Sequence, residues 1–341
     1  MQYFLTIIEI LFYIVSFFIG LYLSMILHEL GHLVCGLLTG YKFNSFVLFK
    51  WQWFKNKKGK IRVKKTATIE GILGQCLMEP IDFKNFRYLL YNLGGGLVNL
   101  LTGIIFWLIY FFLATGNLSI LCFGIAFAAT FLAFTNLFPL RKIATPNDGA
   151  NIREANKSEV AKYGFYIQLK VNAEQAKGKK LTEYDKNTFL VDKKADLTNY
   201  LIAYTVVLNA TYLEEKGKYK ESYKELLRID PEELPGFYRC YVLLCLIFQE
   251  LVYFDDYKTA KKRLKDNENH KFFQTLLKMK HPAFMQINAA KKAFIDHDIK
   301  AANKLIKETK KAIPSLNNSG SEHSIKVSIS SLEEKIKVID V

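Results

Sequence analysis

Long parts of this chain contain almost no charge. Glu9 and Glu29 are the only charged residues before Lys42, and residues 88–140 contain none. Segments that apolar are typical of helices that cross a membrane. The N-terminus also lacks the basic start and the Ala-x-Ala site of a cleavable signal peptide, so we expect the first apolar segment to remain in the protein.

We predict three membrane spans, at residues 3–38, 88–114 and 118–138. As a straight helix the first would be about 54 Å long, well beyond a bilayer core of about 30 Å. It must therefore tilt, kink near Gly20 or end inside the protein. A short polar turn at residues 115–117 joins the other two spans into a helical hairpin.

Cysteine motifs are also missing. The chain has five cysteines, and none lies at Cys-x-x-Cys spacing. That pattern argues against a cysteine-based metal site or a disulfide framework. We expect the cysteines to be small buried hydrophobic residues.

The charge that is present is mostly basic and unevenly placed. Lysine and arginine number 47 against 32 aspartates and glutamates, a net charge of +15. Residues 42–87 hold eleven of the basic residues and three acidic ones. By the positive-inside rule this segment and the C-terminal half face the cytosol, whereas the N-terminus and Gly116 lie outside. Anionic lipid headgroups of a membrane explain the excess basic charge, so we expect membrane lipid and not nucleic acid as a partner. We predict an integral protein of a bacterial cytoplasmic membrane.

The first apolar segment carries the motif His28-Glu29-Leu30-Gly31-His32. Two histidines four apart lie on one face of a helix and can bind one Zn²⁺, while Glu29 can take a proton from a metal-bound water. A single histidine on an apolar helix is more often structural. Three ionisable groups together at lipid depth each cost at least about 2.5 kcal/mol unless they are paired or coordinated. The motif therefore indicates a metal site.

A catalytic zinc usually has three protein ligands. The soluble His-Glu-x-x-His-x-x-Gly-x-x-His class is excluded, because Leu38 stands where its third histidine would be. Candidate third ligands are Glu70, Glu79 and Asp148. Asp148 lies in Pro146-Asn147-Asp148-Gly149, a turn that could direct its carboxylate back to the metal.

Together these motifs resemble the site-2 protease family of intramembrane zinc metalloproteases. The resemblance covers roughly residues 1–150 and rests on the histidine motif, Gly94-Gly95-Gly96-Leu97-Val98-Asn99, and Asn136-Leu137-Phe138-Pro139 followed by Asp148-Gly149. It implies zinc ligands at His28, His32 and Asp148, with Glu29 as the catalytic base. The interval between Pro139 and Asp148 is longer than in the common form Asn-x-x-Pro-x-x-x-x-Asp-Gly.

Other residues in the spans are candidates for substrate binding. Asn99 could hold the unwound backbone of a substrate or a developing oxyanion. Asn136 could do the same, or satisfy backbone groups freed by Pro139. Glycines 94–96 could serve the site or only allow close helix packing.

Between the first two spans we predict an interfacial β-hairpin over residues 43–69. Its first strand is the aromatic segment 43–54, its turn is residues 56–59, and its second strand is residues 60–69. The hairpin could offer an edge to an unwound substrate, or only cover the membrane face of the protein.

The fold class is mainly α, with a soluble helical-repeat domain after the membrane core. Residues 151–196 read as a polar connector. Within residues 197–341, Tyr219, Tyr257 and Ile299 are each followed at +3 by a small residue and at +7 by an aliphatic one. This pattern resembles divergent tetratricopeptide repeats, and a non-repeating bundle is the alternative. Such an array could bind a protein partner or a substrate tail, and could control access to the site.

The sequence thus predicts an intramembrane zinc metalloendopeptidase. Its substrate would be a membrane-spanning protein or peptide, cleaved in regulated intramembrane proteolysis or in remnant signal-peptide processing. One alternative is a membrane scaffold that recruits a partner through its repeats and has a non-catalytic metal site. Another is a membrane-anchored peptidase acting on soluble peptides, with Glu70 or Glu79 as the third ligand.

Overall fold

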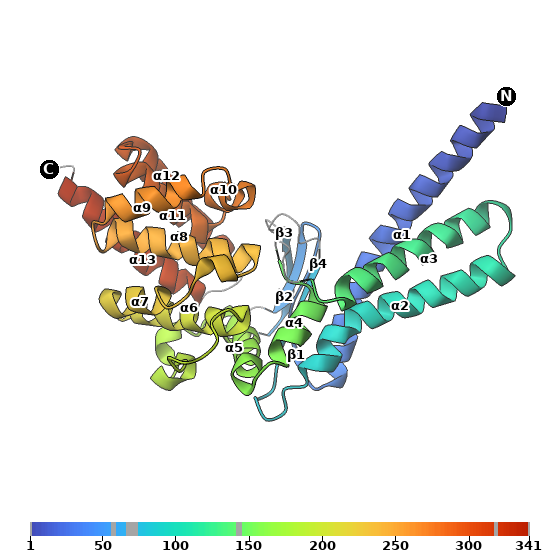
Figure 1. Cartoon of the computed structure of the whole chain (residues 1–341), viewed down its shortest axis with the longest axis horizontal. Coiled ribbons are helices and arrows are strands. Elements are labelled where there is room, and N and C mark those ends of the chain that lie inside the picture. The colour runs from blue at the N-terminus through green and yellow to red at the C-terminus, as the bar shows by residue number, and fades with distance from the viewer. Residues whose placement is uncertain (1, 56–58, 66–73, 141–144, 317–319, 340–341) are drawn as a thin grey trace. The chain divides into compact units, whose positions relative to one another are not determined.

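The protein forms two compact units, seen in a computed structural model that describes residues 2–55, 59–65, 74–140, 145–316 and 320–339 (Figure 1). Apart from short loop segments, the first unit extends to Asn156 and the second begins at Lys157. The first contains three long apolar helices and a small sheet, and the second is helical.

The three apolar helices are α1 (Gln2–Leu38), α2 (Tyr88–Phe112) and α3 (Gly116–Leu137), and each is long and apolar enough to cross a membrane. All three lie side by side in Figure 1 and pack on one another. Each of the three predicted spans thus corresponds to a long apolar helix among the described residues. α1 is helical throughout its 37 residues, including Gly20.

Small residues let these helices approach closely. A Cβ added to Gly20 of α1 would lie 2.6 Å from the carbonyl oxygen of Gly124 on α3. Nearer the other end of α1, a Cβ on Gly31 would lie 2.3 Å from the carbonyl oxygen of Gly94 on α2. Within a membrane, where lipid is as apolar as the helices, such backbone contact is a main source of packing energy.

The described residues of the polar segment after α1 form four strands. They are β1 (Lys42–Leu48), β2 (Trp51–Lys55), β3 (Ile61–Lys65) and β4 (Gly74–Glu79). All three pairings are antiparallel, and the order across the sheet is β3-β2-β1-β4.

The predicted two-stranded hairpin over residues 43–69 is therefore wrong in its strands. Phe49 has a φ of 53°, and a two-residue turn there divides the expected strand 43–54 into β1 and β2. A left-handed backbone is uncommon for a bulky residue, so the aromatic segment gives no turn signal. β4 lies beyond the predicted range, and residues 66–69 lie outside the described residues.

The second unit contains most of the helices. Following α4 (Asp148–Ala155), which belongs to the first unit, they are α5 (Glu159–Ala176), α6 (Tyr200–Glu215), α7 (Tyr219–Leu226), α8 (Gly236–Val252), α9 (Tyr257–Asp266), α10 (Lys271–Lys278), α11 (Pro282–Phe294), α12 (Ile299–Ala312) and α13 (Ser321–Ile339). The described part of this unit also contains four short 3₁₀ helices, η1 to η4, at Leu181–Glu183, Lys186–Phe189, Pro231–Glu233 and Ile313–Ser315.

Three helix pairs in this unit are connected in the same way. The pairs α6–α7, α8–α9 and α11–α12 are each joined at a residue with positive φ, namely Gly217 (72°), Asp255 (53°) and His297 (54°). The small residue at the predicted +3 position, Ser222, Ala260 or Ala302, is 0% exposed in every pair. The sequence repeat therefore corresponds to repeated helix pairs, with α10 inserted before the third.

Residues 157–196 contribute to the core of the second unit. Ile167 and Val171 of α5 pack with Leu181, Phe189 and Leu208 in one buried cluster. The segment that reads as a polar connector thus carries buried side chains, although lysines separate them in the sequence.

We predict that Arg263→Ala destabilises the helices around α8. Glu250 is 0% exposed, and its Oε1 accepts hydrogen bonds from Arg263 Nε at 2.7 Å and from Tyr223 Oη at 2.9 Å. Removing one partner of a buried ion pair costs about 3–5 kcal/mol. Hydrogen exchange of α8 and α9 amides should report the loss, and Glu250→Gln in the same chain should restore most of the protection.

The loss of stability caused by Arg263→Ala should also depend on pH. Burial raises the pKa of Glu250 despite Arg263 and Tyr223. A carboxyl with a raised pKa binds its proton more readily in the folded chain, so protonation favours folding as the pH falls. The Arg263→Ala defect should therefore shrink as the pH is lowered toward about 5. Unchanged exchange at every pH would contradict this role for the pair.

Candidate functional site

The histidine motif lies on the last third of α1, where α2 packs against it. His28 is 9% exposed, Glu29 8% and His32 6%. The two histidines lie one helical turn apart, and their Nε2 atoms are 3.1 Å apart. Both rings therefore point to the same place beside α1.

Asp148 reaches that place from the first residue of α4. Its Oδ2 lies 3.2 Å from His28 Nε2 and 3.2 Å from His32 Nε2. In a tetrahedral zinc site with bonds of about 2.0–2.1 Å, neighbouring ligand atoms are about 3.3–3.4 Å apart. Two imidazoles and one carboxylate in this arrangement fit a zinc ion and leave a fourth position open.

Asp148 is the candidate third ligand that the structure brings to the two histidines. Within the described part of the chain, the group that could hold a metal consists of His28, His32 and Asp148. Glu79 is buried in β4 and is not a member of it. Glu70 falls outside the described residues.

Hydrogen bonds on the outer nitrogens orient the two imidazoles. His32 Nδ1 lies 2.8 Å from the carbonyl oxygen of Tyr91 on α2. A carbonyl can only accept, so Nδ1 carries the proton and Nε2 presents its lone pair to the site. Ligating histidines in metal sites are commonly fixed in this way.

Asn99 is fully buried beside the other imidazole. Its Nδ2 lies 3.3 Å from His28 Nδ1, while its Oδ1 has no hydrogen-bond partner among the described residues. Rotating the amide by 180° would exchange these two atoms, and Oδ1 would then accept from a protonated His28 Nδ1. The pairing leaves His28 Nε2 free for a metal.

Glu29 is held by the sheet. The backbone N–H of Cys76 on β4 donates to its carboxylate. A Cβ on Gly74, two residues earlier, would lie 2.6 Å from Glu29 Oε1. β4 therefore packs directly against Glu29, and a side chain at position 74 would displace the Glu29 carboxylate.

The glycines of α2 have separate contacts. Gly94 meets Gly31 of α1, and Gly96 faces Leu137 of α3. A Cβ on Gly95 would lie 2.6 Å from His28 Nδ1 and 2.6 Å from His32 Nε2. The triplet thus serves both helix packing and the site, which the sequence presented as alternatives.

The side chain of Asn136 bonds within its own helix. Its Nδ2 donates to the carbonyl oxygen of Leu132 on its own helix, and its side chain is partly exposed. Sequence reasoning overlooked Tyr91 and Asn147. Asn147 is the N-cap of α4, a role that its place just before Asp148-Gly149 could have suggested. Tyr91 acts through its backbone carbonyl, which leaves no sequence signal.

The charge of the site favours an anionic Asp148. Burial acts to raise the pKa of this carboxyl, but without a metal, attraction to a protonated His32 and hydrogen bonds from Nε2 of both protonated imidazoles hold the pKa below its usual range. An ionised carboxylate is the form that binds a cation. The cluster therefore combines a charged oxygen donor with two imidazole nitrogens.

Comparison with known protein families gives a match over most of the chain. The family model "Peptidase family M50" matches residues 16–330, which include α1 from Ser16 on, the helices α2 to α12 and the residues His28, Glu29, His32 and Asp148. Neither the curated proteins nor the solved structures yielded a match to this chain.

We predict that Gly95→Ala impairs metal binding whereas Gly96→Ala does not. The added methyl at 95 would meet both imidazoles, but at 96 it would meet only the Leu137 side chain, 2.4 Å away and able to change rotamer. Zinc affinity of the purified protein, measured by chelator competition, should fall about 10–100-fold for Gly95→Ala. Equal affinities for the two variants would contradict the close approach of Gly95 to the histidines.

Proposed function

Since the chain belongs to peptidase family M50, we propose that it is an intramembrane zinc endopeptidase of the site-2 protease type. The family implies a metalloprotease, and three apolar helices suggest a membrane protein. The observation that carries the proposal is the convergence of three donor atoms at 3.1–3.2 Å beside the buried Glu29. His28, His32 and Asp148 hold the zinc in this proposal.

Each residue then has a definite task. Zinc, when bound, supplies the Lewis acid that activates water and polarises a peptide carbonyl. Glu29 accepts a proton from the attacking water and returns it to the leaving amine. The Cys76 N–H keeps the Glu29 carboxylate in place. Burial between α1, α2 and β4 limits the access of other water.

The proposed substrate is a membrane-spanning segment of a protein or peptide. Peptide bonds in a helix are shielded by their own hydrogen bonds, so the segment has to unwind before it is cleaved. Asn136, partly exposed at the end of α3, is suited to bind the freed backbone. Asn99 is the other proposed contact, although its amide already lies against His28. Tethered regulators and remnant signal peptides both meet this description.

The proposed topology follows the basic residues between α1 and α2. It puts the N-terminus outside and the second unit in the cytosol of a bacterial cell. The described strands of that segment carry two cation–π pairs, Lys64 with Phe54 and Lys65 with Trp51. Rings and cations placed together are suited to a lipid headgroup layer.

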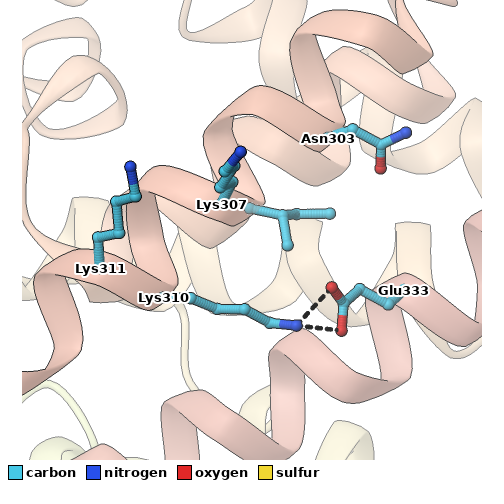
Figure 2. Close-up of a pocket in the computed structure, with 6 residues that line it drawn as sticks. Asn303, Lys307, Lys310, Lys311 and Glu333 are labelled. Atoms are coloured by element: carbon cyan, nitrogen blue, oxygen red, sulfur yellow. Dashed lines mark hydrogen bonds and ion pairs between the residues drawn. The ribbon is translucent and has the colours of Figure 1, made fainter.

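For the second unit we propose a tetratricopeptide-like array that binds an acidic tail of the substrate or of a regulator. A groove of about 400 Å³ on α12 and α13 is lined by Asn303, Ile306, Lys307, Lys310, Lys311 and Glu333. Figure 2 shows Lys310 reaching the Glu333 carboxylate, whereas Lys307 and Lys311 extend elsewhere. Neither forms an ion pair with any described residue.

The spacing of those two lysines matches an extended acidic peptide. Four helical residues rise about 6 Å, and alternate residues of an extended strand are about 6.6–6.8 Å apart. Carboxylates at alternate positions could therefore reach Lys307 and Lys311 together. Asn303, one turn earlier on α12, could bind the peptide backbone.

We predict that Glu29→Gln retains zinc and loses cleavage. Gln keeps the size of the side chain but cannot accept the proton, so the rate should fall about 10²–10⁴-fold. His28→Ala and Asp148→Ala should lose zinc and activity together. Metal analysis and cleavage of membrane segments in liposomes would measure both. A Glu29→Gln protein that cleaves like the wild type would exclude Glu29 as the base, and a zinc-loaded wild type that cleaves nothing would favour the scaffold alternative.

We also predict that Lys307→Glu with Lys311→Glu weakens binding of a labelled peptide of alternating glutamate and glycine by roughly tenfold. The matched control is Lys261→Glu with Lys262→Glu, which makes the same charge change on exposed lysines of α9. Fluorescence anisotropy at fixed ionic strength would measure both. Equal weakening in the two proteins would mean that net charge alone attracts the peptide.

A further inference from the structure

The side chain of Asn147 makes four hydrogen bonds, which is the full number available to an amide. Its Oδ1 accepts from the backbone N–H of Leu140 at 3.1 Å and of Ala150 at 2.9 Å. Its Nδ2 donates to the carbonyl oxygens of Thr135 at 2.6 Å and Phe138 at 2.7 Å. One residue thus joins three segments of backbone.

Those segments are the end of α3, the backbone at Leu140 just after Pro139, and the first turn of α4. The last carbonyls of a helix and its first N–H groups have no partner within the helix. Pro139 has no N–H and prevents α3 from continuing. Asn147 satisfies carbonyls at the end of one helix and an N–H at the start of the next.

Gly149, which follows Asp148, contributes to the same junction between the end of α3 and the start of α4. A Cβ on Gly149 would lie 2.3 Å from the carbonyl oxygen of Leu137. α4 can therefore lie this close to α3 only with glycine at that position. Asp148 is placed between a residue that bonds to the end of α3 and one that touches it.

We propose that Asn147 is a positioning residue that sets the Asp148 carboxylate against His28 and His32. It accepts directly from the backbone N–H of Leu140, the residue just after Pro139, and so ties Asp148 to the end of α3 through its neighbour. Asp148 can then meet the histidines although its distance from Pro139 in the sequence is unusually long. The consequence for zinc rests on the proposed function, whereas the role of Asn147 at the junction does not.

A simple N-cap would behave differently. Asn, Asp and Ser are almost equivalent at an N-cap, because each supplies an acceptor for an N–H in the first turn. Asn147→Ser keeps that acceptor and removes both donors to α3. Asn147→Asp does the same and turns a negative charge toward two carbonyl oxygens. A cap alone tolerates both changes, but a junction that needs all four bonds does not.

The test uses the purified full-length protein with zinc, and with Co²⁺ in its place. Asn147→Ser should lower zinc affinity about 10–100-fold and shift the Co²⁺ absorption spectrum toward that of Asp148→Ala. Asn199→Ser, the same change at the N-cap of α6 in the other unit, should leave both unchanged. Wild-type zinc affinity and spectrum in Asn147→Ser would overturn the proposal.

A readout without metal separates this result from a failure of the proposed function. In the metal-free protein, Asn147→Ser should speed hydrogen exchange at the amide of Leu140 at least about tenfold, whereas the amide of Ala150, which keeps its cap acceptor, and those of α11 and α12 should change little. Unchanged exchange at Leu140 would overturn the junction role. If wild type and His28→Ala bind zinc equally weakly, the metal site fails, and the exchange result still decides the role of Asn147.

Discussion

Three polar atoms lie within 3.2 Å of one another beside an apolar helix, and several close backbone contacts of the first unit permit that approach. α2 can lie against α1 at this depth because Gly31 and Gly94 leave out their side chains. Gly95 then leaves room for both imidazoles, and Gly149 lets α4 approach α3. Each glycine lies where a methyl group would strike backbone or a site histidine. Helix packing and site assembly are thus one steric problem, since relaxing any of these contacts would separate the donor atoms.

The sheet belongs to the same arrangement. The backbone N–H of Cys76 on β4 donates to Glu29, and its carbonyl oxygen accepts from Tyr91 Oη at 2.5 Å. Tyr91 in turn accepts the Nδ1 hydrogen of His32. The proposed base Glu29 and the proposed ligand His32 are therefore both oriented by the same pair of residues, Cys76 and Tyr91. Displacing β4 would disturb Glu29 and His32 together, so the strand does more than cover the membrane face.

Features fixed by composition or short spacing could be predicted from the sequence. Apolar segments longer than 20 residues leave few alternatives to a membrane helix, and the joints of the three helix pairs follow a pattern of small and aliphatic residues. The sheet could not be predicted as well. Phe49 adopts a left-handed backbone that its side chain disfavours, and β4 follows without a recognisable alternation. The contacts of Asn99 and Gly95 with the histidines also depend on how α2 lies along α1, which neither helix encodes alone.

The position of Asp148 shows why spacing along a chain can mislead. An interval between two motifs constrains a site only when the intervening chain is what holds them together. Here the side chain of Asn147 bonds to Leu140, just after Pro139, and to the end of α3, so Asp148 is tied to that helix through its neighbour as well as along the chain. Loop closure costs little more when a loop lengthens by a few residues. A longer interval is therefore compatible with an unchanged donor geometry, provided that a residue beside the ligand anchors it to the preceding helix.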